Sequence, residues 1–161
     1  MNSSKMLAAG IAIVIGTVVL PVMAKQTFRD AKGHVQWTAQ AEGAKIVYRN
    51  AEGKVGGSAQ KESNGKVTYR NAEGKVKGIA QSEPNGKVTY RNAEGKVKGT
   101  RQKEPNGKMT YRTKEGKVTG TAQIDGGGTT TYRNAQGSVA YVVQGEKTIA
   151  DMGFIAFKFF E

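Results

Sequence analysis

The sequence has no cysteine, and among its 161 residues it has only one histidine, one tryptophan and three prolines. Without cysteine the chain can build neither a disulfide framework nor a thiol nucleophile. The single histidine, His34, has no partners for a catalytic triad or a metal cluster, so we expect it at the surface. The glycine run 126–128 lacks the Lys-Ser/Thr step of a phosphate-binding loop. We therefore predict a protein that is not an enzyme and has no metal, cofactor or small-molecule substrate.

Long apolar runs are also missing, except near the N-terminus. Lys5 precedes an uncharged apolar stretch at 7–20, and Pro21 and small residues up to Ala24 follow it. This order is typical of a secretory signal peptide that is cleaved after Ala24. The alternative is an uncleaved membrane anchor, although the stretch is shorter than the roughly 20 residues that a spanning helix needs. We predict a signal peptide at 1–24, a periplasmic or secreted mature chain, and no transmembrane segment after cleavage.

Negative charge is scarce relative to positive charge. The chain has 13 Asp and Glu against 25 Lys and Arg, which gives a formal net charge of +12. A basic balance of this size favours anionic partners such as lipopolysaccharide, acidic polysaccharide or nucleic acid. Solubility alone is the alternative explanation.

What the sequence has in abundance is repetition. An aromatic residue followed by arginine recurs every 20 or 21 residues, at Phe28, Tyr48, Tyr69, Tyr90, Tyr111 and Tyr132. Fixed periods of this length are the signature of repeat architectures, and one short unit buries too little apolar surface to fold alone. We predict one domain of six repeats at 25–144.

Each repeat carries two turn signals. One is Asn-Ala-Glu-Gly, as at 92–95, and the other is Glu-Pro-Asn-Gly, as at 83–86. Short alternating runs between such turns predict β-strands joined as hairpins. The predicted fold is all-β, an antiparallel meander of about twelve short strands. The alternative is a parallel β-solenoid with one repeat per coil.

Side-chain alternation then fixes a predicted register. A three-residue loop flanked by Glu83 and Lys87 would pair Tyr90 with Ala80, and a four-residue loop at 92–95 would pair Tyr90 with Val97. The predicted inner face thus reads Val, Tyr, Val, Gly, Ala in each unit. The glycine is expected to leave room for an aromatic ring, and Trp37 takes its position in the first unit.

In this register the outer face is strongly basic. Arg91 would lie opposite Lys96, and Thr89 opposite Lys98. Like charges opposite one another destabilise a sheet, so we hypothesise that this face binds an anion. The alternative is shielding by turn residues such as Glu94, with lysines that protect strand edges from aggregation. The candidate anion-binding residues are Arg49, Lys54, Arg70, Lys75, Lys77, Arg91, Lys96, Lys98, Arg112 and Lys117.

The last residues leave the repeat pattern. Residues 145–161 are far more apolar than any repeat, and we predict that they form a cap over one end of the array. The alternative is a docking strand for a partner protein. The candidate docking residues are Phe154, Phe157, Phe159 and Phe160.

The string Tyr-Arg-Asn-Ala-Glu-Gly-Lys-Val, followed by Gly, is similar to several families of short hairpin repeats. It resembles the tyrosine-aspartate (YD) repeats of Rhs and toxin-complex shells and the MORN-type variant repeats. A weaker likeness is to the cell-wall-binding repeats of choline- and glucan-binding proteins. These resemblances imply hairpin architecture. Arginine replaces the Asp that follows Tyr in YD repeats, and Trp37 alone cannot build a tryptophan cage, so no binding residues are transferred.

The sequence thus predicts a non-enzymatic exported repeat protein that presents a basic face to anionic envelope or extracellular ligands. The alternative, which the YD and MORN-type likeness suggests, is a protein-interaction role, such as an accessory or immunity protein of a toxin system.

Overall fold

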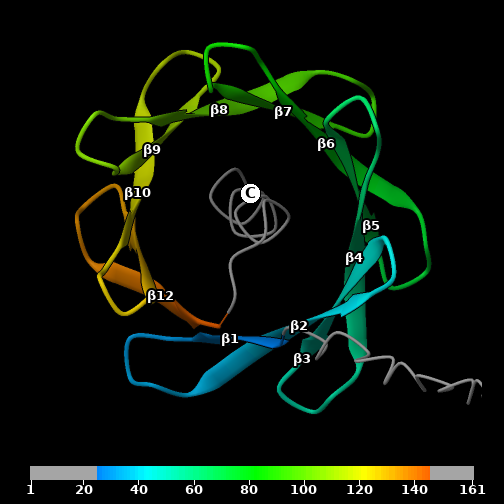
Figure 1. Cartoon of the computed structure of the whole chain (residues 1–161). Helices are drawn as coiled ribbons and strands as arrows, with labels where there is room; N and C mark the ends of the chain where they lie inside the picture. Colours follow the sequence, from blue (N-terminus) through cyan, green and yellow to red (C-terminus); the bar gives the residue numbers. More distant parts are fainter. Residues whose placement is uncertain (1–24, 146–161) are drawn as a thin grey trace, which may run out of the picture.

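Twelve antiparallel strands form a closed barrel in the computed structural model, which describes residues 25–145. Successive strands pair with one another around the barrel, and β1 closes it against β12 (Figure 1). The strands are β1 (Lys25–Arg29), β2 (Val35–Glu42), β3 (Lys45–Asn50), β4 (Val55–Lys61), β5 (Lys66–Asn71), β6 (Val76–Ser82), β7 (Val88–Asn92), β8 (Val97–Lys103), β9 (Met109–Thr113), β10 (Val118–Ile124), β11 (Thr130–Asn134) and β12 (Val139–Gln144).

The predicted all-β antiparallel meander of hairpins is confirmed, and the parallel β-solenoid is wrong. The strand pairs of the barrel are antiparallel, and each strand pairs with its neighbours in the sequence. The single non-sequential pair of the barrel joins the ends of the array, where Phe28 lies opposite Val143. Closure removes both exposed sheet edges, which would otherwise be templates for aggregation. The predicted signal peptide and the apolar segment at 146–161 lie outside the described residues.

A meander barrel has all its odd-to-even connections at one end and all its even-to-odd connections at the other. We call the first the arginine end, with turns at 30–33, 50–53, 71–74, 92–95, 113–116 and 134–137. The second, the glutamate end, includes the turns at 62–65, 83–86 and 104–107.

The register at the glutamate end is as predicted. Tyr90 pairs with Ala80, and the backbone N–H of Glu83 donates to the Lys87 carbonyl at 2.8 Å. Gly86, with φ of 78°, completes the three-residue loop, because a left-handed conformation at this position costs glycine nothing.

The register at the arginine end differs from the prediction. Asn92 N–H donates to the Lys96 carbonyl at 2.9 Å, so this loop also has three residues and not four. The register shift then falls within β8: Arg91 pairs with Val97, and Tyr90 pairs with Gly99. Lys98 is the extra residue of a β-bulge between these pairs. A three-residue loop and one bulge residue place Tyr90 and Gly99 on the same face, as the predicted four-residue loop would also have done.

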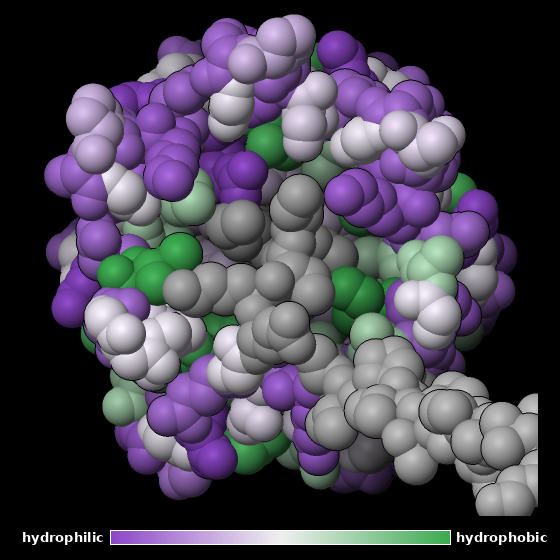
Figure 2. Space-filling model, viewed as in Figure 1, coloured by the Kyte–Doolittle hydropathy of each residue, from purple (hydrophilic) through white to green (hydrophobic). Residues whose placement is uncertain are grey.

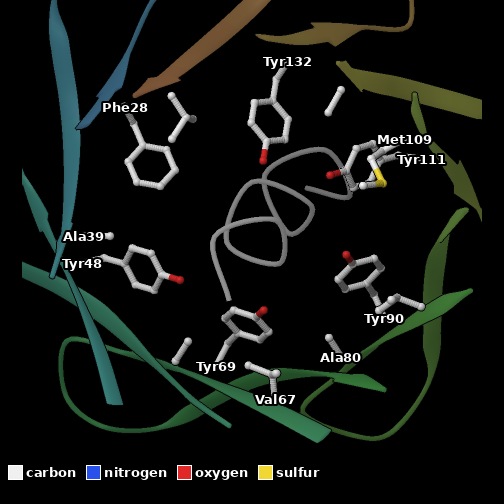
Figure 3. Packing of buried hydrophobic residues seen from close by; sticks show 14 residues of the cluster. Phe28, Ala39, Tyr48, Val67, Tyr69, Ala80, Tyr90, Met109, Tyr111 and Tyr132 are labelled. Atoms are coloured by element: carbon white, nitrogen blue, oxygen red, sulfur yellow. The ribbon is translucent and has the colours of Figure 1, made fainter. Parts of the chain in front are cut away.

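The core is a ring of aromatic side chains on the barrel wall (Figure 3). Phe28, Tyr48, Tyr90, Tyr111 and Tyr132 are each no more than 1% exposed. Rings of successive hairpins contact one another: the Phe28 and Tyr48 ring centroids are 6.4 Å apart in an edge-on arrangement. The tyrosines are thus core residues, as the inner-face prediction required.

The second valine of the predicted inner face is misplaced. Val97 lies opposite Arg91, an exposed residue, and the equivalent Val55 is 41% exposed. The bulge residue next to it shifts the valine to the arginine side of the sheet. The inner face therefore reads Val88, Tyr90, Gly99 and the residue at position 101, without Val97.

Two adjacent glycines of β4, Gly56 and Gly57, leave room for different neighbours. A Cβ on Gly57 would lie 2.6 Å from the Arg70 carbonyl oxygen, so the backbone of the neighbouring strand excludes a side chain at this position. The predicted reason for the glycine, space for an aromatic ring, is therefore wrong at Gly57. The aromatic ring lies one residue earlier, since a Cβ on Gly56 would collide with the indole of Trp37. Trp37 itself occupies the predicted position opposite Phe28.

Candidate functional site

One arginine per hairpin forms a row around the outside of the barrel. Each follows the buried aromatic residue in the chain, so strand alternation turns it to the opposite face of the sheet. Arg91 shows the pattern: its neighbours across the two adjacent strands are Ile79 and Val97. The row, which we call the arginine belt, consists of Arg29, Arg49, Arg70, Arg91, Arg112 and Arg133.

Each belt arginine is fixed by the turn beside it. The Nη1 of Arg91 donates to the Gly95 carbonyl at 3.1 Å, four residues ahead. The corresponding distances are 2.9 Å from Arg29 to Gly33, 3.5 Å from Arg49 to Gly53, 3.1 Å from Arg70 to Gly74, 3.2 Å from Arg112 to Gly116 and 3.0 Å from Arg133 to Gly137. The same bond therefore repeats in all six hairpins and holds each guanidinium in a defined place.

The predicted like-charge pairs are absent from the register. Arg91 faces Val97 and not Lys96, and Thr89 faces Thr100 and not Lys98. Repulsion between cations that face each other on adjacent strands therefore gives no argument that this surface binds an anion. The basic residues proposed as an anion site are nevertheless exposed at the arginine end, apart from Arg49, which is half-buried.

Turn carboxylates shield part of this charge. Glu94 Oε2 lies 3.2 Å from the Lys96 ammonium, as the shielding alternative predicts for that turn, and Arg49 lies 3.6 Å from Glu42. Exposed pairs of this kind contribute little stability and are weakened by salt. Lys77 and Lys98 are bulge residues and are exposed.

The glutamate end uses its charges locally. Glu83 accepts a hydrogen bond from the Thr89 hydroxyl at 2.5 Å and pairs with the Lys87 ammonium at 3.3 Å. The Thr89 bond is the main cause that lowers the pKa of the Glu83 carboxyl, and partial desolvation acts against it. Glu62 repeats the arrangement with Thr68 and Lys66. Glu62 and Glu83 are thus each paired with a lysine of their own turn.

Sequence reasoning missed one charged residue of the interior, Arg101. It pairs with Val88 and Tyr111 on the core-facing side of β8 and is only 8% exposed. The equivalent residues of the other hairpins are Ala39, Ala59, Ala80, Ala122 and Val143, all in the core. The signal was present in the repeat alignment, because the other hairpins have only alanine or valine at this position.

The tyrosine hydroxyls share this interior. Burial raises the pKa of Tyr90 to about 12, and Arg101 acts weakly in the opposite direction. Burial likewise raises the pKa of Tyr111 well above its ordinary value, with further contributions from Tyr132 and Tyr90. These hydroxyls therefore stay protonated and act as neutral hydrogen-bonding groups over the physiological pH range.

The other candidates give no site. His34 is a surface residue, as predicted: its side chain is 71% exposed and its Nδ1 lies 3.3 Å from Asp30. Within residues 25–145, no three metal-ligating side chains gather into a group. The candidate docking residues Phe154, Phe157, Phe159 and Phe160 lie outside the described residues.

The comparisons with known proteins identify no family. No protein-family model matches the chain, and no curated protein matches it. Across the part of the chain that the structure describes, no helix is both long enough and apolar enough to span a bilayer. Among solved structures, the chain is similar to BamB from Moraxella catarrhalis, with 8% identity over 74% of this chain and 72% of that chain, at a TM-score of 0.29.

Proposed function

We propose that the protein is a non-enzymatic, exported binding protein that captures polyanions on its arginine belt. The observation that carries the proposal is the sixfold repetition of an outward guanidinium held by its own turn carbonyl. Belt arginines of adjacent hairpins are two strands apart, which corresponds to about 9.5 Å at the usual strand spacing. The belt is therefore a regular array of cations along a closed circumference.

The fixed geometry favours binding. A free arginine side chain loses rotamer entropy when it captures a ligand, whereas these side chains are already held in place. The bond to the glycine carbonyl uses one of the five guanidinium N–H groups, so the others can donate to phosphate, sulfate or carboxylate oxygens. The cross-strand neighbours Ile79 of Arg91 and Thr100 of Arg112 carry no charge that would compete with the ligand.

The ligand class follows from this surface and from the predicted export. A belt of repeated cations suits a polymer or aggregate with repeated anionic groups more than a single small anion. In the envelope or outside the cell, lipopolysaccharide phosphates and acidic polysaccharides have this chemistry. Figure 2 shows many hydrophilic residues around the rim of the viewed end, with some hydrophobic residues among them.

The test is retention on heparin and binding of purified lipopolysaccharide as salt is raised. The belt variant is the triple change Arg70→Gln, Arg91→Gln and Arg112→Gln. The matched control removes three positive charges at the glutamate end, with Lys66→Gln, Lys87→Gln and Lys108→Gln. Both variants have the same net charge, so a difference between them reports on the position of the charge.

We expect the belt variant to lose at least tenfold in affinity and its salt slope to fall by about 2 to 3, since each lost anion contact removes close to one unit. The control should keep most of the affinity. Equal losses in the two variants would mean that net charge alone drives binding, and the belt would have no special role.

A further inference from the structure

The belt arginines are related to one another by one repeated step. On β6, Arg70 pairs with Val76. The next belt arginine, Arg91, pairs three positions further along the same strand, with Ile79. The other even-numbered strands, β2, β4, β8, β10 and β12, have the same offset of three, so the step also crosses the seam to Arg29.

Equal steps around a closed barrel place the belt in one plane. The steps lead from Arg29 through the other belt arginines and back to Arg29, so their displacements along the barrel axis cancel. Because the steps are equal, each one has no displacement along that axis. The belt is therefore a ring perpendicular to the axis along which Figure 1 views the barrel.

This ring lies at the level of the turns of the arginine end. Each belt guanidinium donates to the glycine carbonyl of its own turn, as Arg91 does to Gly95. The six turns close with the same type of hydrogen bond, 2.8 to 3.0 Å long, such as that from Asn92 N–H to the Lys96 carbonyl. Because the turns are alike and are related by the same step, they end at a common height. The arginine end is therefore a flat rim with one guanidinium in every hairpin.

Positive charge is concentrated at this rim. The six segments that run from a belt arginine to the bulge position beyond its turn, such as 91–98, contain fourteen Lys and Arg against five Asp and Glu, a net charge of +9. The rest of residues 25–145 has eight against five, a net charge of +3. The barrel thus presents its excess of charge at one end.

A flat ring of cations suits a flat anionic surface more than a linear chain. A stiff polyanion that lies along the outer wall is tangent to the belt and meets about two of its arginines, because neighbouring arginines are a sixth of a turn apart. A plane that faces the arginine end meets all six hairpins at once. Binding through several linked contacts is far tighter than binding through one or two.

Apolar side chains lie among the cations of the rim. Val97 is the cross-strand partner of Arg91, and the equivalent Val55 is 41% exposed. Five of the six turns have an exposed alanine after their first residue, as Ala93 shows. Small uncharged tips allow close approach of a surface to the guanidinium groups. A rim of this kind suits a lipid interface, in which anionic headgroups overlie an apolar layer, more than a polysaccharide without such a layer.

We propose that the arginine end docks end-on against the surface of an anionic phospholipid bilayer, with the belt guanidinium groups on the headgroup phosphates. Headgroup phosphates of phospholipids lie in one plane at the bilayer surface, whereas those of lipopolysaccharide lie beneath its sugar chains. Anionic headgroups attract clusters of Lys and Arg within about one Debye length of the surface. This inference rests on the proposed function, of which it names the partner and the orientation.

The absence of cysteine allows a direct test of the orientation in the full chain. Ala93→Cys and Ser63→Cys each introduce a single exposed thiol at the second position of a turn, the first at the arginine end and the second at the glutamate end. Each thiol is labelled with a fluorophore, and vesicles of phosphatidylglycerol and phosphatidylcholine with nitroxide-labelled headgroups are added. A seven-residue strand tilted by about 40° separates the two ends by about 18 Å, which is enough to distinguish them.

We expect binding that salt weakens, no binding to phosphatidylcholine alone, and about threefold stronger quenching at Ala93→Cys than at Ser63→Cys. The described chain begins and ends at the glutamate end, with Lys25 and Gly145, so attachment through the adjoining segments would bring that end to the lipid. Equal quenching, or stronger quenching at Ser63→Cys, would overturn end-on docking. Retention on heparin without vesicle binding would overturn the lipid partner and leave the proposed function intact, whereas loss of both would count against the proposed function as well.

A pair of charge variants tests the docking face without a label. The arginine-end variant adds three carboxylates at exposed turn tips, with Ala51→Glu, Ala72→Glu and Ala93→Glu. The matched control adds three at the glutamate end, with Ala44→Glu, Ser63→Glu and Gly126→Glu. We expect the first to lose at least about tenfold in affinity for phosphatidylglycerol vesicles and the control less than about twofold. Equal losses would show that net charge drives vesicle binding, and the assigned docking face would be wrong.

Discussion

Replacement of Gly57 by alanine is a sharp test of the barrel register, because the structure gives the expected clash atom by atom. Gly57 lies on β4 between Tyr48 on β3 and Asn71 on β5. A Cβ at this residue would be 2.6 Å from the Arg70 carbonyl oxygen, a backbone atom that cannot rotate away. The strands β4 and β5 must separate locally to admit the methyl group. Overpacking of this kind costs about 1 to 3 kcal/mol.

The assay is thermal and urea unfolding of the full chain, with Gly126→Ala as the matched control. A methyl group on Gly126 would meet no heavy atom within 4 Å, so this change should be neutral or stabilise by up to about 1 kcal/mol. For a domain of this size, 1 to 3 kcal/mol corresponds to a fall in Tm of roughly 4 to 15 °C. If Gly57→Ala unfolded within about 0.5 kcal/mol of the unchanged chain, the close approach of the Arg70 carbonyl would be refuted.

Three further predictions address the tyrosine ring and the two kinds of turn. Burial raises the pKa of Tyr90 to about 12. The protonated hydroxyl therefore contributes about 2 to 3 kcal/mol to the free energy of unfolding below pH 10, and this contribution is lost between pH 10 and pH 12. Alkaline unfolding should show this fall, and Tyr90→Phe should reduce it. Asn92→Ala removes the acceptor of the Lys96 N–H at 2.9 Å and should cost about 1 kcal/mol in urea unfolding, whereas no loss would show that the turn needs no side-chain acceptor. Thr89→Val should raise the pKa of Glu83 toward its ordinary value, which an NMR pH titration of that carboxyl measures.

Much of the fold was predictable because turn chemistry acts locally. The Glu-Pro-Asn-Gly turn closes between Glu83 and Lys87 as the sequence indicates, since proline and glycine each restrict the backbone at a known position of the loop. The core position of the tyrosines follows from the alternation that this turn starts. Both inferences depend on a few neighbouring residues, and both are confirmed.

The arginine end was harder to predict because two solutions have the same parity. A four-residue loop and a three-residue loop with a bulge both place Tyr90 and Gly99 on one face, and they differ only in the places of Val97 and Lys98. Asn92 decides between them, because its side chain accepts the Lys96 N–H and closes the shorter loop. The alternation of apolar and polar residues contains no information about a side-chain acceptor of this kind.

Closure of the barrel was also beyond the repeat pattern. Twist accumulates over all the strands, and whether the last strand meets the first depends on that sum and not on any one hairpin. The pairing of Phe28 with Val143 joins two segments at opposite ends of the array. The first and last hairpins also depart from the repeat, with Trp37 and Tyr141 in the glycine column.

The arginines of this protein separate into two classes when their surroundings are compared. A belt arginine such as Arg91 is exposed and donates to a turn carbonyl, so its presence costs little and its remaining donors suit a ligand. Arg101 is buried at a position where the other hairpins have alanine or valine, and its strand partners are Val88 and Tyr111 of the core. Net charge treats all of these cations alike, whereas burial separates the outer ones, which the proposed function uses, from the inner one. The two classes should therefore respond differently to mutation: a belt substitution should change the salt dependence of polyanion binding, and Arg101→Ala should leave it unchanged.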